Sequence, residues 1–334
     1  MCPAWHVCTS GSVRPALSRL AIAILDDYQD VARSFAPWGD LDADLTVFTD
    51  HVDGFERLAE RLAPFDVLVA MRERTPFGAN LLARLPRLRL LVTTGMANAA
   101  IDLAAATAHG VVVCGTRIMP GPTAGLTWGL ILGLLRHIPE ELGNVRSGAW
   151  QTTVGVDVDG LTLGVLGFGR LGRRVAAVAR AFEMDVIAWS QNLQPDAARD
   201  GGAEPVSFEE LLERSDVLSV HTRLSDRTRG LIGAPELARM KPSAVLVNTS
   251  RGPILDEAAL VAALHDGTIA GAALDVFDRE PLAPDHPLRS APNALVTPHI
   301  GYVTTANYEV FYGDAVADIA AFAAGAPVRV LDER

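Results

Sequence analysis

Three polar residues of types that can assist the reduction of a carbonyl group by a hydride donor lie in short motifs late in the chain. Arg251 lies in NTSRGP, Glu280 in FDREP and His299 in TPHIGY, and each motif follows an apolar, strand-like segment. An arginine holds a carboxylate through two parallel hydrogen bonds, and a protonated histidine gives its proton to a carbonyl oxygen as hydride reaches the carbon. A glutamate orients the histidine and stabilises its protonated form. Reduction of a small 2-keto acid requires this set of side chains.

A glycine-rich loop ahead of these motifs indicates a dinucleotide site. The segment GFGRLG, residues 167–172, follows an apolar strand directly and opens an amphipathic helix. Gly167 permits the tight turn, Gly169 lets the backbone approach a pyrophosphate, and Gly172 lets the helix pack closely on the strand. The N–H groups at the start of that helix are expected to bind the phosphates.

The end of the next strand bears on the choice between NAD and NADP. An acid at this position binds the ribose hydroxyl of NAD and repels the 2′-phosphate of NADP. The strand ends instead in Ser190, Gln191 and Asn192, and no Lys or Arg follows at once. Ser190 and Asn192 can bond either a hydroxyl or a phosphate. The sequence therefore favours NADP slightly and leaves NAD open.

The elements that must position these residues alternate between strands and helices. Such alternation predicts parallel sheets with helices on their faces, and six strands in the second half predict a doubly wound dinucleotide-binding fold. In the first half the expected strands are 20–25, 46–48, 67–70, 90–93 and 111–113, with helices at 55–62 and 80–85. In the second half they are 161–166, 185–190, 216–221, 244–248, 271–276 and 294–297, with helices at 170–182, 208–213, 235–240 and 256–265 and a short closing helix at 307–324.

One segment breaks this alternation. Residues 123–138 are too long for a strand and predict a single buried helix. Gly125, Gly129 and Gly133 are four residues apart and therefore share one face of it. We expect that face to pack closely against another helix, in the chain or in a second subunit.

The composition limits the classes of partner and compartment. With 334 residues and a net charge of −11, the chain is expected to be globular and not to bind nucleic acid. No apolar run reaches the ~20 residues of a membrane helix, so no membrane association is expected. The three cysteines form no metal-binding or disulfide pattern, and Cys114 is expected to be a buried apolar residue. Residues 1–18 are irregular and lack the features of a secretory signal, so we expect an extension of a cytoplasmic protein.

The motifs together carry a resemblance to a known family. From Arg19 to Val330 the chain is similar to the D-isomer-specific 2-hydroxyacid dehydrogenases, in particular glyoxylate/hydroxypyruvate reductase-like and phosphoglycerate dehydrogenase-like members without a regulatory domain. The segments NTSRGPILDEAAL, ALDVFDREPL and TPHIGY after a G-x-G-x-x-G loop are typical of that family. The resemblance implies hydride transfer between NAD(P)H and a small 2-keto acid, with a glyoxylate or hydroxypyruvate type of substrate favoured.

The resemblance also implies roles for individual residues. Arg251 is expected to orient the substrate, and Glu280 and His299 to form the acid–base pair. No metal site is expected. The substrate candidates are Gly95, Met96, Ala97, Arg72 and Arg251. The cofactor-binding candidates, of which Asp275 and Thr123 are implied to lie near the nicotinamide, are Gly167, Gly169, Arg170, Leu171, Gly172, Ser190, Asn192, His221, Thr222, Thr249, Asp275 and Thr123.

The family architecture implies two doubly wound domains: a Rossmann cofactor domain inserted into a smaller, flavodoxin-like substrate domain. The substrate domain comprises residues 19–119 and 299–334, and the cofactor domain residues 120–298. The catalytic cleft is then expected between the domains, with a hinge motion that assembles the site. The family also implies a homodimer and a D-isomer product.

Several alternatives stay open at this stage. A relative acting on another small anion, such as phosphite, or a dinucleotide-sensing protein similar to the family's corepressors can retain the same residues. Arg72, Arg74 and Tyr28 either meet the substrate's distal end or lie in solvated loops. Trp128 and Trp150 are expected in the core. The family often has Ala-Glu where this chain has Ala-Gly at 124–125, which leaves local packing or the subunit contact open.

Overall fold

The structure, a computed structural model, describes residues 19–332 in two compact units. Unit 1 comprises residues 19–118 and 308–332, and unit 2 comprises residues 119–307. The sequence-based boundaries lay at 119/120 and 298/299, so His299 falls in the unit that contains the glycine-rich loop. The assignment of the two parts to substrate and cofactor stays a prediction. The interpretation of residues 1–18 as an extension lies outside the described residues.

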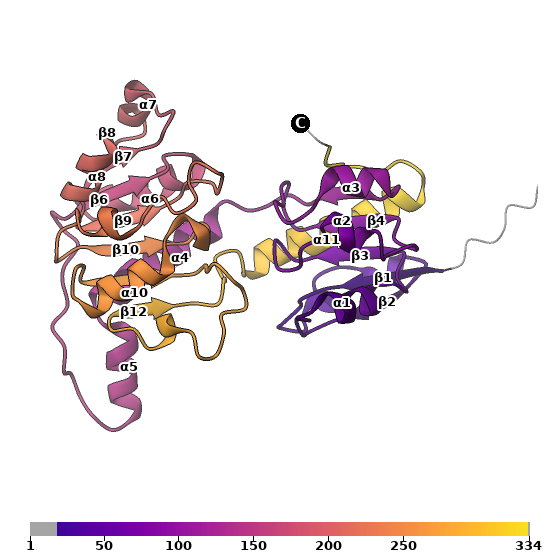
Figure 1. The fold of residues 1–334 in the computed structure, drawn as a ribbon, viewed down its shortest axis with the longest axis horizontal. Helices are drawn as coiled ribbons and strands as arrows, with labels where there is room; N and C mark the ends of the chain where they lie inside the picture. Colours follow the sequence, from indigo (N-terminus) through magenta and orange to yellow (C-terminus); the bar gives the residue numbers. More distant parts are fainter. Residues whose placement is uncertain (1–18, 333–334) are drawn as a thin grey trace, which may run out of the picture. The chain divides into compact units, whose positions relative to one another are not determined.

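Unit 1 is built on a five-stranded parallel sheet with the order β2-β1-β3-β4-β5 (Figure 1). Its strands are short and apolar, and those in the middle are buried on both faces, as parallel strands between helices must be. The strands are β1 Leu20–Ile24, β2 Ala43–Val47, β3 Val67–Ala70, β4 Leu90–Thr93 and β5 Val112–Gly115. The helices are α1 Phe55–Leu62, α2 Ala79–Leu82, α3 Leu103–Ala108 and α11 Thr305–Ala323, and the 3-10 turns are η1 Ala32–Ser34 and η2 Trp38–Asp40.

The core of unit 1 joins segments from both ends of the chain. Leu62 of α1 and Leu82 of α2 pack with Leu68 of β3 and Leu91 of β4 in one hydrophobic cluster. Helix α11 returns to this unit, where Phe311, Tyr312 and Ile319 are fully buried. The expected closing helix is therefore present, but with 19 residues it is long rather than short.

Unit 2 contains a seven-stranded parallel sheet with the order β12-β11-β10-β9-β6-β7-β8. This is the doubly wound arrangement, and it confirms two parallel-sheet α/β domains. The seventh strand, β8, is a two-residue pairing that the sequence pattern did not predict. The strands are β6 Thr162–Leu166, β7 Asp185–Trp189, β8 Glu204–Pro205, β9 Val217–Val220, β10 Val245–Asn248, β11 Gly271–Leu274 and β12 Ala294–Val296.

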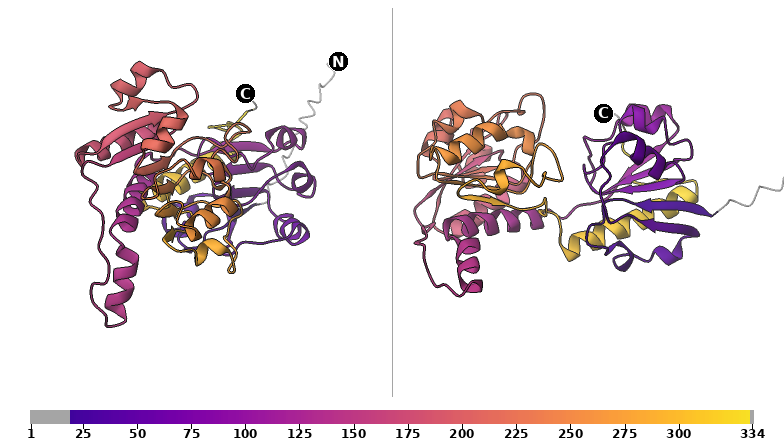
Figure 2. Two further views of the ribbon diagram at one scale, coloured as in Figure 1. Left: turned by 60° about the vertical axis from the view of Figure 1, so that its left-hand side comes forward. Right: turned by 60° about the horizontal axis from the view of Figure 1, so that its bottom comes forward.

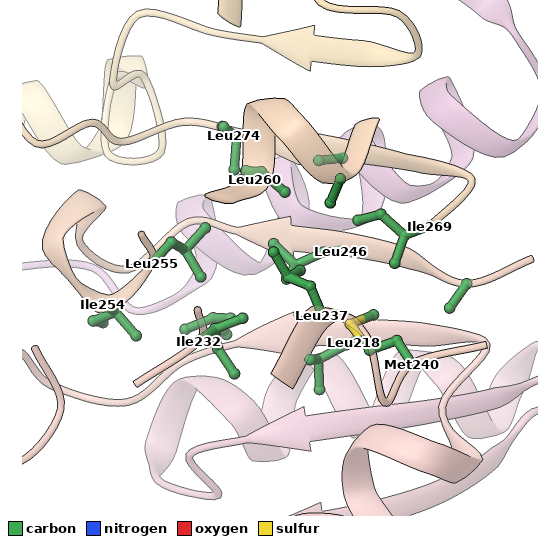
Figure 3. Close-up of a cluster of buried hydrophobic side chains, with 14 of the residues drawn as sticks. Leu218, Ile232, Leu237, Met240, Leu246, Ile254, Leu255, Leu260, Ile269 and Leu274 are labelled. Carbon is green, nitrogen blue, oxygen red and sulfur yellow. The ribbon is translucent and has the colours of Figure 1, made fainter. Parts of the chain in front are cut away.

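Helices cover both faces of the unit 2 sheet. On one face α4 and α6 pack through Ile131 and Val175, and on the other α8, α9 and α10 pack around Leu218 and Leu246 (Figure 3). The two faces are apolar because successive strand residues point to opposite sides. The helices are α4 Gly121–Leu135, α5 Ile138–Arg146, α6 Arg170–Ala181, α7 Pro195–Asp200, α8 Phe208–Arg214, α9 Ala234–Leu237 and α10 Glu257–His265, and the 3-10 turns are η3 Gly252–Ile254 and η4 Pro287–Arg289.

The single helix expected over 123–138 is wrong at its end. Helix α4 ends at Leu135, and α5 begins at Ile138. Between them His137 adopts a left-handed conformation with φ +50°. Pro139 explains the break, because its ring would clash with the carbonyl of Leu135 in a continuous helix.

Helix α5 and the extended segment after it lie apart from the sheet of their own unit (Figure 2). The expectation that Trp150 lies in the core is wrong, because its residue surface is 73% exposed, whereas Trp128 is buried. On α4, a Cβ added at Gly125 or Gly129 would meet no atom within 4 Å among residues 19–332. These two glycines therefore pack against no helix in the part of the chain that the structure describes.

Candidate active site

Three neighbouring strands of unit 2 bring the polar motifs to one edge. Strands β10, β11 and β12 are adjacent and parallel, so their carboxyl ends lie side by side. Arg251 follows β10, Glu280 follows β11 and His299 follows β12. Open α/β sheets bind ligands at this edge.

His299 and Glu280 form a hydrogen-bonded pair. His299 Nδ1 donates to Glu280 Oε2 over 2.6 Å, and the two side chains are 15% and 24% exposed. The other oxygen of Glu280 accepts the backbone N–H of Phe277 over 3.0 Å, which fixes the carboxylate. Since Nδ1 is used by the carboxylate, Nε2 is the ring atom available for proton transfer.

Asp275 anchors the backbone that carries His299. Its side chain is buried and accepts N–H bonds from Ile300 and Gly301, both over 2.8 Å, and the hydroxyl of Thr297 over 2.7 Å. Burial raises the pKa of Asp275, while the hydrogen bonds and nearby His299 oppose that rise. His299 itself has φ +53°, a conformation that needs such support in a residue with a side chain.

The histidine ring also packs on an aromatic neighbour. The rings of His299 and Tyr302 meet edge to face with centroids 5.4 Å apart. The carbonyl of Tyr302 accepts a hydrogen bond from Asn307 Nδ2 over 2.8 Å. The hydroxyl of Thr123 donates to the carbonyl of Gly301 over 3.0 Å, so two successive carbonyl groups after His299 are held by side chains.

Arg251 lies in a turn that its own neighbours stabilise. Asn248 Nδ2 donates to the carbonyl of Arg251 over 2.9 Å, and Asn248 Oδ1 accepts the N–H of Ser250 over 2.9 Å. The guanidinium Nη1 donates to the carbonyl of Ser250 over 2.7 Å. A fork of five N–H donors held in this way is suited to bind a carboxylate.

The glycine-rich loop has the geometry that a bound pyrophosphate requires. Gly167 has φ +102°, and a Cβ there would overlap the backbone of Thr222. A Cβ at Gly172 would overlap the carbonyl of Gly167, so α6 packs directly on the loop. A Cβ at Gly169 would instead enter open space at the start of α6, the room that a phosphate group fills when it approaches the helix N-terminus. The residues present therefore fit a dinucleotide.

Other predicted cofactor residues lie along the same edge. Ser190 follows β7 and its hydroxyl accepts the N–H of Phe168 over 2.7 Å, so it braces the glycine-rich loop. The hydroxyls of Thr249 and Thr127 are 2.9 Å apart. Arg170 and Asn192 are exposed, and Leu171 is half-buried at the start of α6.

His221 follows β9 directly and lies beside this loop. Its Nε2 lies 2.8 Å from the hydroxyl of Ser219, and Nδ1 is buried without a hydrogen-bond partner among the described residues. Burial lowers the pKa of His221 to about 4, so the ring is neutral near pH 7. A neutral ring at this position suits a contact with an uncharged part of a dinucleotide.

The remaining substrate candidates lie in unit 1. The turn at Gly95 has φ +95° and follows β4, and its N–H bonds the hydroxyl of Thr116 over 2.9 Å. Arg72 follows β3 and donates from Nη1 to the carbonyl of Thr94 over 2.8 Å. A Cβ at Gly95 would overlap that guanidinium, so Arg72 lies directly against the 95–97 turn. Met96 is exposed and Ala97 follows it in the same turn.

Two acid–histidine pairs are present for which the sequence analysis made no prediction. His51 Nδ1 bonds buried Asp26 over 2.9 Å, and Asp26 also accepts the hydroxyl of Thr75 over 2.7 Å. In unit 2, His286 Nε2 lies 3.3 Å from Glu257 Oε2. The partners of each pair are far apart in sequence, so no local motif could have predicted them.

The described residues also limit the kinds of site. Between residues 19 and 332, no group of three or more His, Cys, Asp or Glu side chains could hold a metal ion. Within the same range, no helix has both the length and the apolar character needed to cross a membrane.

A doubly wound domain with a fitted dinucleotide loop and an Arg, Glu and His set at the adjacent strand ends defines a nicotinamide-dependent dehydrogenase. Comparison with known proteins supports this class. A family model described as "D-isomer specific 2-hydroxyacid dehydrogenase, NAD binding domain" matches residues 128–301. The chain therefore belongs to the D-isomer-specific 2-hydroxyacid dehydrogenase family, and its cofactor is a nicotinamide dinucleotide.

Individual relatives agree with this assignment. A glyoxylate reductase of Aeropyrum pernix is 42% identical over 256 residues, which cover 74% of this chain and 76% of the relative. A glycerate dehydrogenase of Methylorubrum extorquens is 35% identical over 83% of this chain and 88% of its own length. The crystal structure of a putative D-3-phosphoglycerate dehydrogenase from Ralstonia solanacearum has a TM-score of 0.88 and 39% identity, covering 93% of this chain and 96% of that one.

Proposed function

We propose that the protein reduces a small 2-keto acid of the glyoxylate or hydroxypyruvate type to the D-2-hydroxy acid. The observation that carries this proposal is the 2.6 Å bond between His299 Nδ1 and Glu280 Oε2 on the strand edge that also presents Arg251. Relatives named glyoxylate reductase and glycerate dehydrogenase support a keto acid of two or three carbon atoms as the substrate.

The chain's own residues divide the work in reduction. Arg251 binds the substrate carboxylate and draws electron density toward the carbonyl oxygen. His299 donates a proton from Nε2 to that oxygen, and Glu280 stabilises the imidazolium before transfer. A bound nicotinamide dinucleotide supplies the hydride. The backbone of Gly95, Met96 and Ala97 and the side chain of Arg72 are proposed as further substrate contacts.

We infer a slight preference for NADPH over NADH. Ser190 and Asn192 stand where NAD-selective sites place an acid, and neither repels a 2′-phosphate. Arg170 lies exposed at the start of α6, on the loop that binds the dinucleotide, and its charge favours an additional phosphate.

One assay tests both parts of this proposal. Glyoxylate, hydroxypyruvate, pyruvate and phenylpyruvate are each mixed with the enzyme and either NADH or NADPH, and the nicotinamide absorbance is followed. Oxidation of the cofactor with at least one acid is expected, fastest with glyoxylate or hydroxypyruvate and NADPH. Intact cofactor binding without turnover of any acid would contradict the reductase function and favour a dinucleotide sensor.

We also propose that the protein forms a homodimer through α5 and its neighbourhood. Ile138, Leu142 and Val145 are exposed and spaced four and three residues apart, so they form one apolar face of α5. Trp150 and Val154 in the following segment are exposed as well. An apolar face of this kind is typically covered by protein, and the open sides of Gly125 and Gly129 on α4 leave room for a second copy's helix.

A further inference from the structure

We propose that Glu257 is a positioning residue for the acid–base pair: it holds the peptide bond between Phe277 and Asp278, and with it the segment that carries Glu280, against the Arg251 turn. This inference rests on the proposed roles of Arg251, Glu280 and His299. It concerns only unit 2.

Glu257 reaches out of its own helix. It is the first residue of α10, but the cap of that helix is Asp256, whose side chain accepts the N–H of Ala259 over 3.0 Å. The carboxylate of Glu257 instead accepts the N–H of Asp278 over 2.7 Å, across 21 residues of sequence. Its role is therefore a contact between two segments and not the capping of α10.

A histidine holds the second oxygen of Glu257. His286 Nε2 lies 3.3 Å from Glu257 Oε2, and His286 Nδ1 accepts the N–H of Leu288 over 3.3 Å. Because Nδ1 accepts, the ring proton is on Nε2 and points at the carboxylate. The Glu257 side chain is only 14% exposed, so its two bonds restrict it to one orientation.

The same peptide bond contacts the Arg251 turn from its other side. A Cβ added at Gly252 would overlap the carbonyl carbon of Phe277 and the amide nitrogen of Asp278. Backbone thus lies directly on backbone, one residue after Arg251. Glu257 accepts the N–H of the Phe277–Asp278 peptide bond, and Gly252 packs directly against the same peptide bond.

Phe277 links this peptide bond to Glu280. The N–H of Phe277, which belongs to the preceding peptide bond, donates to Glu280 Oε1 over 3.0 Å, and Glu280 Oε2 bonds His299 Nδ1 over 2.6 Å. The two peptide bonds share the Cα atom of Phe277, so a shift of the 277–278 peptide bond displaces the N–H that holds the Glu280 carboxylate beside His299. Displacement of about 1 Å in such a set can cost up to ~100-fold in rate.

The charges around Glu257 are mixed. Asp278 and Asp256 raise the local negative charge, while His286 and Arg229 oppose it. Burial raises the pKa of Glu257, and its bonds to Asp278 and His286 counter that rise. The acid–base pair itself is faced in this unit by Asp275, whose carboxylate interacts electrostatically with His299.

The test compares Glu257→Ala, Glu257→Asp and Glu257→Gln in the full-length enzyme. We expect kcat for keto-acid reduction to fall about 10- to 100-fold in Glu257→Ala, with the KM for the nicotinamide dinucleotide unchanged. Glu257→Asp is too short to span both bonds and should show the same changes. Glu257→Gln keeps an oxygen that can accept the Asp278 N–H and should restore most of the activity.

Glu210→Ala is the matched control. Glu210 also accepts one backbone N–H, that of Ser207 over 2.9 Å. It lies at the start of α8, which packs against β6 and β7 and not against the strands that carry the acid–base pair. Glu210→Ala should leave kcat unchanged. If Glu257→Ala, or Glu257→Asp where the alanine variant does not fold, keeps the wild-type kcat, the positioning role is wrong. A wild-type enzyme inactive on every keto acid would contradict the proposed function instead.

Discussion

At the scale of single residues, the chemistry depends on side chains that are held before any substrate arrives. Glu280 is fixed by Phe277 and in turn fixes His299, whose backbone is anchored by Asp275. Preorganisation of this kind lowers the reorganisation needed during reaction. The proposed proton donor is therefore set in one orientation by bonds that do not involve the substrate.

Replacement of His299 tests the proposed donor. His299→Ala should lower the rate of keto-acid reduction about 100-fold or more, because the carbonyl oxygen loses its proton source. Fluorescence titration with NADPH should show unchanged cofactor affinity. An unchanged reduction rate in His299→Ala would contradict the assignment of His299 as the proton donor.

Replacement of Arg251 tests the carboxylate site. Arg251→Ala should raise the KM for the keto acid and also lower kcat, because the guanidinium binds the carboxylate and polarises the carbonyl. The KM for the cofactor should stay within about twofold of the wild-type value, since the proposed contact is to substrate alone. Normal keto-acid kinetics would show that the substrate carboxylate is bound elsewhere.

His221 makes a prediction about stability and pH. Its pKa is lowered to about 4 in the folded protein, below the ordinary value of 6.5. The unfolded chain therefore binds a proton first, so this residue's stabilising contribution is complete above pH 6.5 and is lost as pH falls toward 4. Between pH 7.5 and pH 5 the loss should be roughly 2 kcal/mol. Urea unfolding should show a smaller acid sensitivity in His221→Gln, and equal sensitivity would argue against the buried neutral ring.

At the scale of elements, close contacts between backbones place the dinucleotide loop. Helix α6 packs closely on β6 because Gly172 has no Cβ that would overlap the carbonyl of Gly167 or the side chain of Val165. The N-terminus of α6 therefore lies next to the open space beside Gly169. The same device occurs at Gly252, where the Arg251 turn meets the Phe277–Asp278 peptide bond.

Adding one methyl group to α6 tests this packing. Gly172→Ala should move the helix off the strand and weaken NADPH binding about 10-fold or more, since the phosphate-binding N–H groups shift with it. Gly313→Ala is the control, because a Cβ at that helical position meets no atom within 4 Å. Isothermal titration should find wild-type affinity in the control and reduced affinity in Gly172→Ala. Equal affinities would mean that the helix position does not govern binding.

At the scale of the whole molecule, α5 and the segment after it present apolar side chains that the described part of the chain leaves exposed. Val154 is 90% exposed and Trp150 73% exposed. Glu141 ties the segment to α5 by accepting the N–H groups of Thr152 and Thr153, over 2.9 and 2.7 Å. The apolar surface is thus held in a defined shape, which favours a second copy as its partner.

A charge on this surface tests the proposed dimer. Light scattering after gel filtration should give twice the chain mass of 35.5 kDa for the wild-type protein. Leu142→Asp places a carboxylate in the proposed contact and should shift the protein toward the single-chain mass. Arg199→Asp, on exposed α7, should leave the mass unchanged. A wild-type monomer, or a dimer that survives Leu142→Asp, would refute this surface as the interface.

The local pattern of residues was sufficient for much of this protein. The alternation of strands and helices, the glycine-rich loop and the three motifs around Arg251, Glu280 and His299 are each encoded within a few neighbouring residues, and they predicted the fold class and the family. Helix α5 was missed because a single apolar run hid the break at His137, and Trp150 was misplaced because an apolar side chain alone does not show what covers it.

Tertiary structure decided which separate segments meet. The 2.6 Å pairing of His299 with Glu280, the anchoring of that loop by Asp275 and the reach of Glu257 to Asp278 join residues that are 19 to 25 positions apart. Sequence fixes the type of each side chain, but strand order and the close approach of backbones at Gly172 and Gly252 determine its neighbours. Those contacts depend on packing across the whole sheet, and no local pattern of residues contains them.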